Sequence, residues 1–450
     1  MSDLHTSFGL PHAGAPRVTD AADGIGLLRS GKARADSLLA YGNGRSYGDT
    51  CLNASGTLID MRSADTLLSF DAQAGLIEAE AGLMLSDIIA YAAPSGWFPA
   101  VVPGTRFVTL GGSIANDVHG KNHHRRGTFG KHVESLRLAR SDGTVVECSR
   151  TENVDLFSAT IGGMGLTGLI LSAKLRLMRV GSLDVEERVT RFGSLEEYLE
   201  IAADADLENE YAVAWIDQLA RGKRQGRGLL LTGNHAGEGR LDGTTSRSML
   251  AVPFRSPVNV LSRPFLKLFN EAYFRGKSRR SGPGLSSWAS FFFPLDGVRN
   301  WNRLYGPRGL LQHQSVVPDA EAHRALPLLF KAARDAGHGS FLTVLKRFGD
   351  VASPGMLSFP RPGYTLTLDF PNRGPRTMAL MAELDRITVE AGGAVNPYKD
   401  ARMSAAVFRA SFPDWRRVEA LRDLAFVSDF WRRTALALQA QDVPIREAAE

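Results

Sequence analysis

The chain is poor in cysteine, with only Cys51 and Cys148 among its 450 residues. Two thiols cannot build a disulfide scaffold or a zinc site of the paired CxxC type. Scarce cysteine also fits a reducing compartment, so we expect a cytoplasmic protein.

Long apolar runs are missing as well. No stretch approaches the roughly 18 uncharged apolar residues that a membrane-spanning helix needs. The N-terminal residues MSDLHTSFGLPHAG lack the basic start and apolar centre of a secretory leader. We therefore expect no transmembrane helix, and any membrane contact would be peripheral, at the inner membrane.

Charge of one sign is not in large excess, since 53 Lys and Arg against 48 Asp and Glu leave a formal net charge of +5. This excess is a weak signal for nucleic acid, and we expect no nucleic-acid partner. Glycine, in contrast, is plentiful at 46 residues, which favours sites where the backbone itself contacts a ligand. The length suits two domains rather than one.

Strand and helix signals divide the chain into two parts. Residues 38–180 hold short apolar runs broken by glycine, which predict strands, with one helix expected over 83–96. Alternating strands and amphipathic helices follow, including a helix over 194–205 with a capping-box start. Residues 236–290 are rich in Gly, Ser, Arg and Pro and are expected to include a mobile surface segment. The pattern of residues 413–440 predicts helices. We expect them to dock on the surface of the fold rather than to lie on a membrane.

The first glycine-rich motif is YGNGRSYGD, from Tyr41 to Asp49. It follows a strand, and its three glycines permit positive φ angles and an open backbone. The residues after it are polar and turn-like rather than helical, so it is not a Rossmann fingerprint, and it is not a P-loop because no GKS or GKT closes it. Spacing alone leaves a tight hairpin loop and a phosphate cradle equally open.

The second motif runs from Val102 to Val133 and holds six glycines. Its four histidines are His119, His123, His124 and His132. Their spacing does not match HExxH, and no carboxylate or thiolate set accompanies them, so we expect no metal. A glycine-rich backbone beside basic side chains instead suits the pyrophosphate of a dinucleotide, with an ordinary solvated loop as the alternative.

A third motif, TIGGMGLTGLI from Thr160 to Ile170, again lets backbone approach a flat ligand closely. In this order, the three motifs resemble those of the decaprenylphosphoryl-β-D-ribose 2-oxidase family, within the vanillyl-alcohol-oxidase or PCMH-type FAD-binding superfamily. The resemblance covers most of the chain apart from the N-terminus and roughly residues 236–285. It continues through FFFPLDGVRNWNRLYGPRG (291–309), LQHQ (311–314), FLTVLKRFG (341–349), LDFP (368–371), PYKDAR (397–402) and SDFWRR (428–433).

This resemblance implies an α+β fold. A two-subdomain FAD-binding domain of the PCMH type would occupy residues 1–182. An α+β substrate domain with an antiparallel sheet would occupy residues 183–393. Residues 394–450 would return to the FAD domain and carry the active-site lysine.

The resemblance also implies FAD, bound between the two subdomains. Related oxidases attach the flavin to a histidine of the first loop, but Arg45 stands at that place and cannot form the bond. Cys51 lies beyond the loop, so we expect non-covalent FAD. The implied cofactor-binding residues are Tyr41, Gly42, Asn43, Gly44, Arg45, Ser46, Tyr47, Gly48, Asp49, Gly104, Thr105, Thr109, Gly111, Gly112, Asn116, Asp117, Val118, His119, Gly162, Gly165, Ile170 and Asn396.

Alcohol oxidation is the implied chemistry, in which a base takes the hydroxyl proton while hydride passes to the flavin. Lys399 matches the family lysine beside the flavin, and burial with the like charge of His119 would lower its pKa. His119 is the second candidate for the base. Lys346 is a candidate partner for a substrate phosphate. The implied substrate-binding residues are Gln314, Lys346, Thr365, Thr367 and Asp369.

Two positions depart from the family pattern. Thr367 stands where the mycobacterial enzymes have the cysteine that covalent nitroaromatic inhibitors attack, so such inhibition should fail here. Asn396 stands where the family has a tyrosine, which changes the shape of the pocket. Both departures indicate a homologue outside the mycobacteria.

The implied function is oxidation of the 2-hydroxyl of a polyprenyl-phosphoryl ribose to the 2-keto sugar. This is the first half of epimerisation to the arabinose donor used in arabinan and cell-wall biogenesis. A short-chain NAD(P)H-dependent reductase would complete it, and quinone or oxygen would reoxidise the flavin. The alternatives are an oxidase of a free alditol, sugar or aldonolactone, against which Arg45 weighs, and a non-catalytic flavin module, against which Lys399 and His119 weigh.

Overall fold

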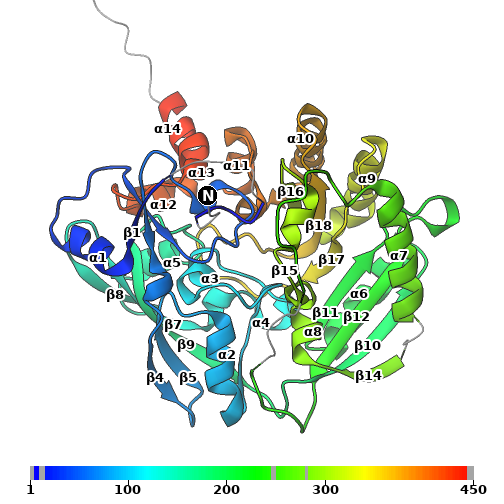
Figure 1. The fold of residues 1–450 in the computed structure, drawn as a ribbon, viewed down its shortest axis with the longest axis horizontal. Helices are drawn as coiled ribbons and strands as arrows, with labels where there is room; N and C mark the ends of the chain where they lie inside the picture. The colour runs from blue at the N-terminus through cyan, green and yellow to red at the C-terminus, as the bar shows by residue number, and fades with distance from the viewer. Residues whose placement is uncertain (1–4, 10–15, 245–249, 279–281, 443–450) are drawn as a thin grey trace, which may run out of the picture.

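The computed structural model describes residues 5–9, 16–244, 250–278 and 282–442. Within them, helices combine with three larger sheets and one two-stranded pair (Figure 1). The first part of the chain builds two of the larger sheets, and the middle part builds the third. The α+β fold class is therefore confirmed.

The smallest of the three larger sheets is parallel and has the strand order β1-β3-β2. Its strand β2, which is mostly buried, leads the chain into the first glycine-rich motif, and that motif begins at the last residue of β2. Its elements are β1 (Arg17–Asp20), α1 (Ala21–Arg29), β2 (Leu38–Tyr41) and β3 (Thr57–Asp60).

The second sheet is antiparallel, with the order β4-β5-β9-β7-β8 and with β6 paired to β9. β9 is its long central strand, and over residues 173–178 buried side chains alternate with more exposed ones. The strands are β4 (Leu67–Asp71), β5 (Leu76–Glu80), β6 (Trp97–Pro99), β7 (Val133–Ala139), β8 (Val145–Ser149) and β9 (Leu169–Arg179). The helices among them are α2 (Leu85–Ala92), α3 (Leu110–Ala115), α4 (His123–Arg126) and α5 (Val154–Thr160).

The third sheet has eight strands, in the order β14-β10-β12-β11-β17-β18-β16-β19. Its paired strands are antiparallel, as expected for the substrate domain. The strands are β10 (Val185–Phe192), β11 (Tyr211–Ile216), β12 (Gly228–His235), β14 (Gly282–Ser286), β16 (Leu310–Val317), β17 (Thr343–Phe348), β18 (Gly363–Pro371) and β19 (Ala394–Val395). The short pair is β13 (Leu250–Ala251) with β15 (Val298–Arg299).

Helices cover one face of this third sheet. These are α6 (Leu195–Glu208), α9 (Ala322–Asp335) and α10 (Pro375–Glu390). Leu311, Leu345 and Leu366 point from the sheet into that core. Because side chains alternate along a strand, their neighbours on β16, β17 and β18 point to the opposite face. That opposite face carries polar residues and borders the cavity described below.

Local sequence signals gave correct helices in two places. The helix expected over 83–96 is α2 followed by a 3-10 turn, and Gly96 ends it with a φ of +76°. The capping box predicted for 194–205 is present in α6. Ser194 accepts a hydrogen bond from the Glu197 amide (3.2 Å), and the Glu197 carboxylate reaches back to the Gly193 amide (2.6 Å).

The range 236–290 holds regular structure that the sequence patterns do not predict, while the mobile segment expected within it stays a prediction. The range contains α7 (Arg263–Ser278), β14 and α8 (Trp288–Phe292), while residues 245–249 and 279–281 lie outside the described part of the chain. α7 buries Leu266, Asn270 and Phe274, which lie four residues apart on one face. Composition hid this helix because its other face is basic and exposed.

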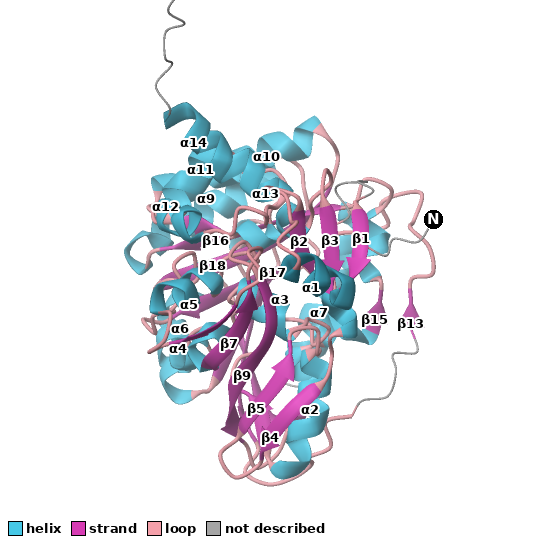
Figure 2. Cartoon of the chain, turned by 90° about the vertical axis from the view of Figure 1, so that its left-hand side faces the viewer, coloured by secondary structure: helices cyan, strands magenta, loops and turns pink. Residues whose placement is uncertain are grey.

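The C-terminal segment docks on the fold, as expected. Its helices are α11 (Ala405–Ser411), α12 (Trp415–Leu421), α13 (Asp429–Trp431) and α14 (Ala437–Asp442), with a π-turn over Arg432–Leu436. They gather at one end of the molecule beside α9 and α10 (Figure 2). Trp415, Phe430 and Trp431 are fully buried there, in a core shared with Met164 and Phe348.

No helix among the described residues is long and apolar enough to span a bilayer. The domain boundaries at residues 182 and 393 stay a prediction. The C-terminal helices join the parts on either side of the first boundary, because their core contains side chains from both.

Candidate active site

A cavity of about 1040 Å³ lies between the glycine-rich motifs and the polar face of the eight-stranded sheet. All three motifs border it, together with side chains from β16, β17 and β18. Residues more than 200 positions apart in sequence therefore share one site.

The first motif forms a loop held against the second. The Asn43 side-chain amide donates to the Phe107 carbonyl (2.8 Å), and the Arg45 Nε donates to the same oxygen (3.4 Å). Gly44 has a φ of +59°, and a Cβ there would lie 2.2 Å from the Tyr41 hydroxyl. Only glycine satisfies both the backbone angle and the space at that position.

The second motif contributes the first turn of α3. Thr109 caps it by accepting a hydrogen bond from the Gly112 amide (3.1 Å). A Cβ on Gly42 would lie 2.5 Å from the Thr109 Oγ1, so the absence of a side chain lets the two loops meet. At Gly104 and Gly165, in contrast, a Cβ would meet nothing within 4 Å, because the backbone there borders open space.

His119 belongs to the second motif and lies where that motif meets the eight-stranded sheet, between Lys346 of β17 and Gln314 of β16. The Lys346 Nζ is 2.9 Å from its Nδ1, and the Gln314 Nε2 is 3.2 Å from its Nε2. Burial, Lys346, His123 and Lys399 hold the pKa of His119 well below its usual value. The imidazole is therefore neutral.

The hydrogen bonds around Gln314 define which nitrogen of His119 carries the proton. The Gln314 carbonyl accepts from the Asn396 amide (2.9 Å), and its Nε2 donates to the Thr365 hydroxyl (3.1 Å). With its amide nitrogen toward His119, Gln314 donates to Nε2, which leaves the proton on Nδ1. Burial, Lys121 and Lys399 lower the pKa of Lys346 to about 7. The Nζ of a neutral Lys346 can therefore accept a hydrogen bond from the Nδ1–H of His119.

Lys399 is the last residue of a 3-10 turn, Pro397–Lys399, and borders the same cavity. Its Nζ lies 4.2 Å from the centre of the Tyr47 ring, and no hydrogen bond engages it within the described residues. Burial lowers its pKa to about 8, against the opposing attraction of Asp369. The like charge that we expect from His119 is missing, because the buried imidazole is neutral and carries no charge.

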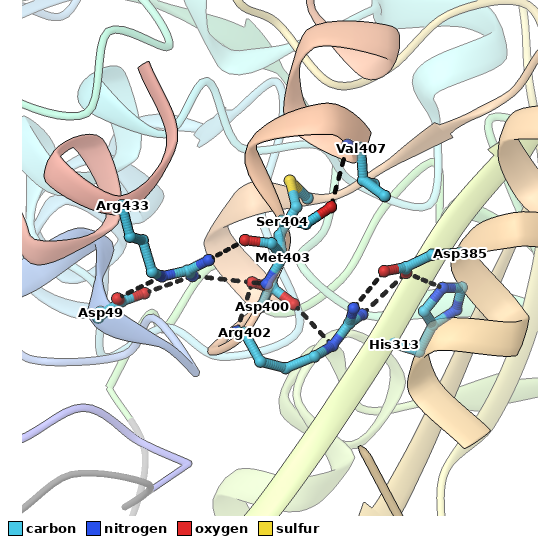
Figure 3. Close-up of polar contacts among 9 residues, drawn as sticks. All are labelled: Asp49, His313, Asp385, Asp400, Arg402, Met403, Ser404, Val407 and Arg433. Atoms are coloured by element: carbon cyan, nitrogen blue, oxygen red, sulfur yellow. Dashed lines mark hydrogen bonds and ion pairs between the residues drawn. The ribbon is translucent and has the colours of Figure 1, made fainter. Parts of the chain in front are cut away.

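A chain of buried charges holds the Lys399 turn in place (Figure 3). Arg433 donates to both oxygens of Asp49 (2.8 and 2.9 Å) and to Asp400 (2.9 Å). Asp400 also pairs with Arg402 (3.2 Å), which binds Asp385 with both terminal nitrogens. The three carboxylates are at most 3% exposed.

This chain joins three separate elements. Asp49 ends the first motif, Arg433 belongs to the C-terminal segment, and Asp385 lies on α10 and also contacts His313 of β16 (3.2 Å). The backbone adds a further tie, because the Tyr47 amide donates to the Tyr398 carbonyl (3.0 Å). The motif loop and the lysine turn are thus fixed to each other.

Most of the sequence-predicted site residues border the cavity. Those at its wall are Tyr41, Gly42, Asn43, Gly44, Arg45, Ser46, Tyr47, Gly104, Thr105, Thr109, Gly111, Gly112, Asn116, Asp117, Val118, His119, Gly165, Ile170, Gln314, Lys346, Thr367, Asn396 and Lys399. The predicted residues that do not line the cavity are Gly48, Asp49, Gly162, Thr365 and Asp369. Asp49 faces Arg433, and Asp369 accepts a hydrogen bond from Gln312.

Sequence reasoning missed Gln312, Tyr398 and Asp296, which also border the cavity. Gln312 could have been found, because it lies two residues before Gln314 on a strand and so faces the same side. Asp296 accepts a hydrogen bond from the Arg106 amide (3.0 Å) and so joins two distant segments. No local pattern reveals such a pair.

Residues 14–149 match the family model of the FAD binding domain. The chain is 34% identical over 428 residues to decaprenylphosphoryl-beta-D-ribose oxidase of Mycolicibacterium smegmatis, which covers 91% of this chain and 92% of the relative. The chain belongs to the decaprenylphosphoryl-β-D-ribose oxidase family. It is an FAD-dependent oxidoreductase.

Two further relatives are similar to this chain over different shares of its length. An uncharacterized protein of Streptomyces coelicolor is 36% identical over 76% of this chain and 97% of its own length. L-gulonolactone oxidase of Mus musculus is 30% identical over 30% of this chain and 30% of its own length. The likeness to the lactone oxidase is therefore confined to a part of the chain.

The cavity wall suits FAD. Open backbone at Gly104 and Gly165 and the close contact of Gly42 with Thr109 leave room for a long ligand between the two motifs. Cys51 lies beyond the first loop in sequence and also borders the cavity. Burial raises the pKa of its thiol to about 12, so it lacks the thiolate needed to attack a flavin.

Proposed function

We propose that this protein oxidises the 2-hydroxyl of a polyprenyl-phosphoryl ribose to the 2-keto sugar. The observation that carries the proposal is the meeting of Lys399, His119 and Gln314 at one cavity wall, beside the loops suited to FAD. The family relative that spans 91% of the chain is named for oxidation of the corresponding decaprenyl-linked ribose.

FAD supplies the hydride acceptor when it is bound. Lys399 takes the proton of the sugar hydroxyl, because its Nζ is free of hydrogen bonds within the described residues and its pKa is about 8. His119 already has both ring nitrogens engaged, so its role is to orient the sugar together with Gln314. The Lys346 Nζ also donates to the Gly120 carbonyl (3.0 Å), so it supports His119 rather than binding a substrate phosphate.

The proposal extends to the partners of the reaction. A 2-keto sugar needs a reductase, for which we propose a short-chain NAD(P)H-dependent enzyme that completes epimerisation to the arabinose donor. Quinone or oxygen would reoxidise the flavin. We place the reaction in the cytoplasm, with the enzyme peripheral at the inner membrane.

Anaerobic flavin bleaching tests the substrate. The purified holoenzyme is mixed with a short-chain, water-soluble polyprenyl-phosphoryl ribose, and the visible flavin band is followed. Rapid loss of the band supports the proposal. A persistent band with this substrate, together with full bleaching by a free alditol or aldonolactone, would overturn it.

A further inference from the structure

Large apolar side chains are exposed together on α7 and on the loop before it. On the loop, Phe254 and Val258 are 66% and 64% exposed. On α7, Phe265 and Leu268 are 44% and 72% exposed. α7 lies on the outer side of the eight-stranded sheet, at the right of the molecule in Figure 1. These side chains face away from the helix side that carries Leu266 and Phe274.

This surface adjoins the rim of the cavity. The loop is held by hydrogen bonds from the Ser256 amide to the Arg303 carbonyl (3.0 Å) and from the Val260 amide to the Leu304 carbonyl (3.1 Å). Leu266 of α7 shares a hydrophobic cluster with Trp301, and Trp301 borders the cavity. A molecule lying along α7 therefore reaches the site by way of residues 295–305.

Arginines from separate segments gather beside the first turn of α7. A Cβ on Gly337 would lie 2.6 Å from an Arg376 guanidinium nitrogen and 3.5 Å from one of Arg263. Arg373 lies close enough to both for their charges to lower its pKa in addition to its burial. Arg308 approaches the start of α10, because a Cβ on Gly374 would lie 3.4 Å from its guanidinium.

These four arginines have no acidic partner among the described residues. In the part of the chain that the structure describes, none of the ion pairs involves Arg263, Arg308, Arg373 or Arg376. The nearest carboxylate on α7, Glu271, is already paired with Arg227 and Arg275. Like charges held together without counterions repel one another, so the cluster favours an external anion.

We propose that the basic apolar surface, defined as Phe254, Val258, Phe265, Leu268 and the arginine cluster, docks the enzyme on an anionic phospholipid membrane. Arginines bind headgroup phosphates, and the adjacent apolar side chains enter the acyl boundary. The idea rests on the proposed function, because a polyprenyl-linked substrate is held in a membrane and its sugar must reach the cavity beside this surface. A second copy of the chain is a poorer occupant, because a twofold contact would place each arginine cluster against the same surface of its partner.

Vesicle sedimentation tests the surface. The FAD-loaded enzyme is sedimented with vesicles of phosphatidylglycerol and phosphatidylcholine, and with phosphatidylcholine alone. Binding is expected to the anionic vesicles, and to fall as salt rises. The double variant R263E/R376E should bind more than about tenfold more weakly, because each basic residue near an anionic surface contributes about 1 kcal/mol.

The apolar part and the controls are tested alongside. Leu268→Ser should weaken vesicle binding without removing it. The matched control is R137E/L207S, which changes an exposed arginine on β7 and a leucine that is 77% exposed on α6. The control should bind vesicles as the unchanged enzyme does. All variants should retain FAD and bleach normally with the water-soluble short-chain substrate.

Three outcomes contradict the docking surface. They are no binding of the unchanged enzyme to anionic vesicles, equal binding to phosphatidylcholine alone, and equal weakening by the control. Bleaching with the short-chain substrate involves no vesicle. Its failure therefore overturns the proposed function, whereas failed sedimentation with normal bleaching overturns the docking surface alone.

Discussion

At the residue scale, two candidate bases at the cavity, Lys399 and His119, differ in their hydrogen bonding. Lys399 has its Nζ over the Tyr47 ring, whereas both nitrogens of His119 lie within hydrogen-bond distance of neighbours. A group that must take a proton needs a lone pair directed at the substrate. Lys399 alone has one available without breaking a hydrogen bond.

Replacing Lys399 with methionine keeps most of its volume and removes the amine. We expect anaerobic flavin reduction to slow by about 10²- to 10⁴-fold, the usual contribution of a general base. Bound FAD should stay near the level of the unchanged enzyme. Lys331→Met serves as the control, because Lys331 is exposed on α9. A Lys399→Met enzyme that reduces its flavin at the normal rate would show that another group is the base.

The same assignment sets a pH dependence. Burial lowers the pKa of Lys399 to about 8, and the base must be neutral to accept a proton. The reduction rate should therefore rise with pH and level off above about 8, as measured by stopped flow across pH 6 to 10. A rate that falls over this range contradicts a neutral lysine base.

Gly48 provides a third prediction at the residue scale. A Cβ there would lie 1.4 Å from the Asp400 carbonyl oxygen, which is backbone and must move. Gly48→Ala should lower the free energy of unfolding by about 3 kcal/mol and weaken FAD retention. Gly26→Ala on α1, where a Cβ meets nothing within 4 Å, should instead stabilise by about 0.5–1 kcal/mol. Equal effects in urea unfolding would contradict the close contact at Gly48.

At the element scale, the lysine turn depends on partners distant in sequence. The turn is tied to the first motif through Arg433 and to α10 through Arg402. The position of the turn is therefore set by contacts that form only when the first motif, α10 and the C-terminal segment pack together.

Removing Arg433 tests this dependence. Arg433→Ala leaves Asp49 and Asp400 buried without their shared cation. We expect a loss of about 3 kcal/mol in the free energy of unfolding. The two carboxylates would stay buried, without the arginine and without water to solvate their charge. Arg386→Ala, which breaks exposed pairs with Glu383 and Glu390, should lose less than about 1 kcal/mol. Chemical denaturation of both variants makes the comparison, and similar losses would argue against the buried clamp.

Sequence patterns predicted the elements unevenly. Local signals sufficed for α2 and α6, whose caps lie within a few residues of the helix. They failed for α7, because a helix that buries only a narrow stripe beneath a basic face reads as a polar surface segment. The glycine loops were found because their backbone needs are local, whereas the contact between Asp49 and Arg433 arises only when the chain folds.

At the scale of the whole molecule, the site exists only where three parts of the chain meet. The motif loops supply the wall for FAD, the polar face of the eight-stranded sheet supplies Gln314 and Lys346, and the C-terminal part supplies Lys399. The resemblance located these residues individually. It could not show that His119 lies against Lys346, because that distance depends on how β17 meets the second motif.

At the scale of the whole molecule, we also predict that FAD is bound without a covalent bond to the protein. Arg45 occupies the place where related oxidases carry the linking histidine, and its Nε donates to the Phe107 carbonyl. Burial holds the Cys51 side chain as a thiol. With neither group able to bond the ring, FAD is retained by the packed loops alone, so unfolding should release all of it. Acid precipitation followed by absorbance of the supernatant checks this, with an FAD standard for recovery. A yellow pellet that keeps its flavin after washing in denaturant would mean that another side chain of the cavity forms the bond.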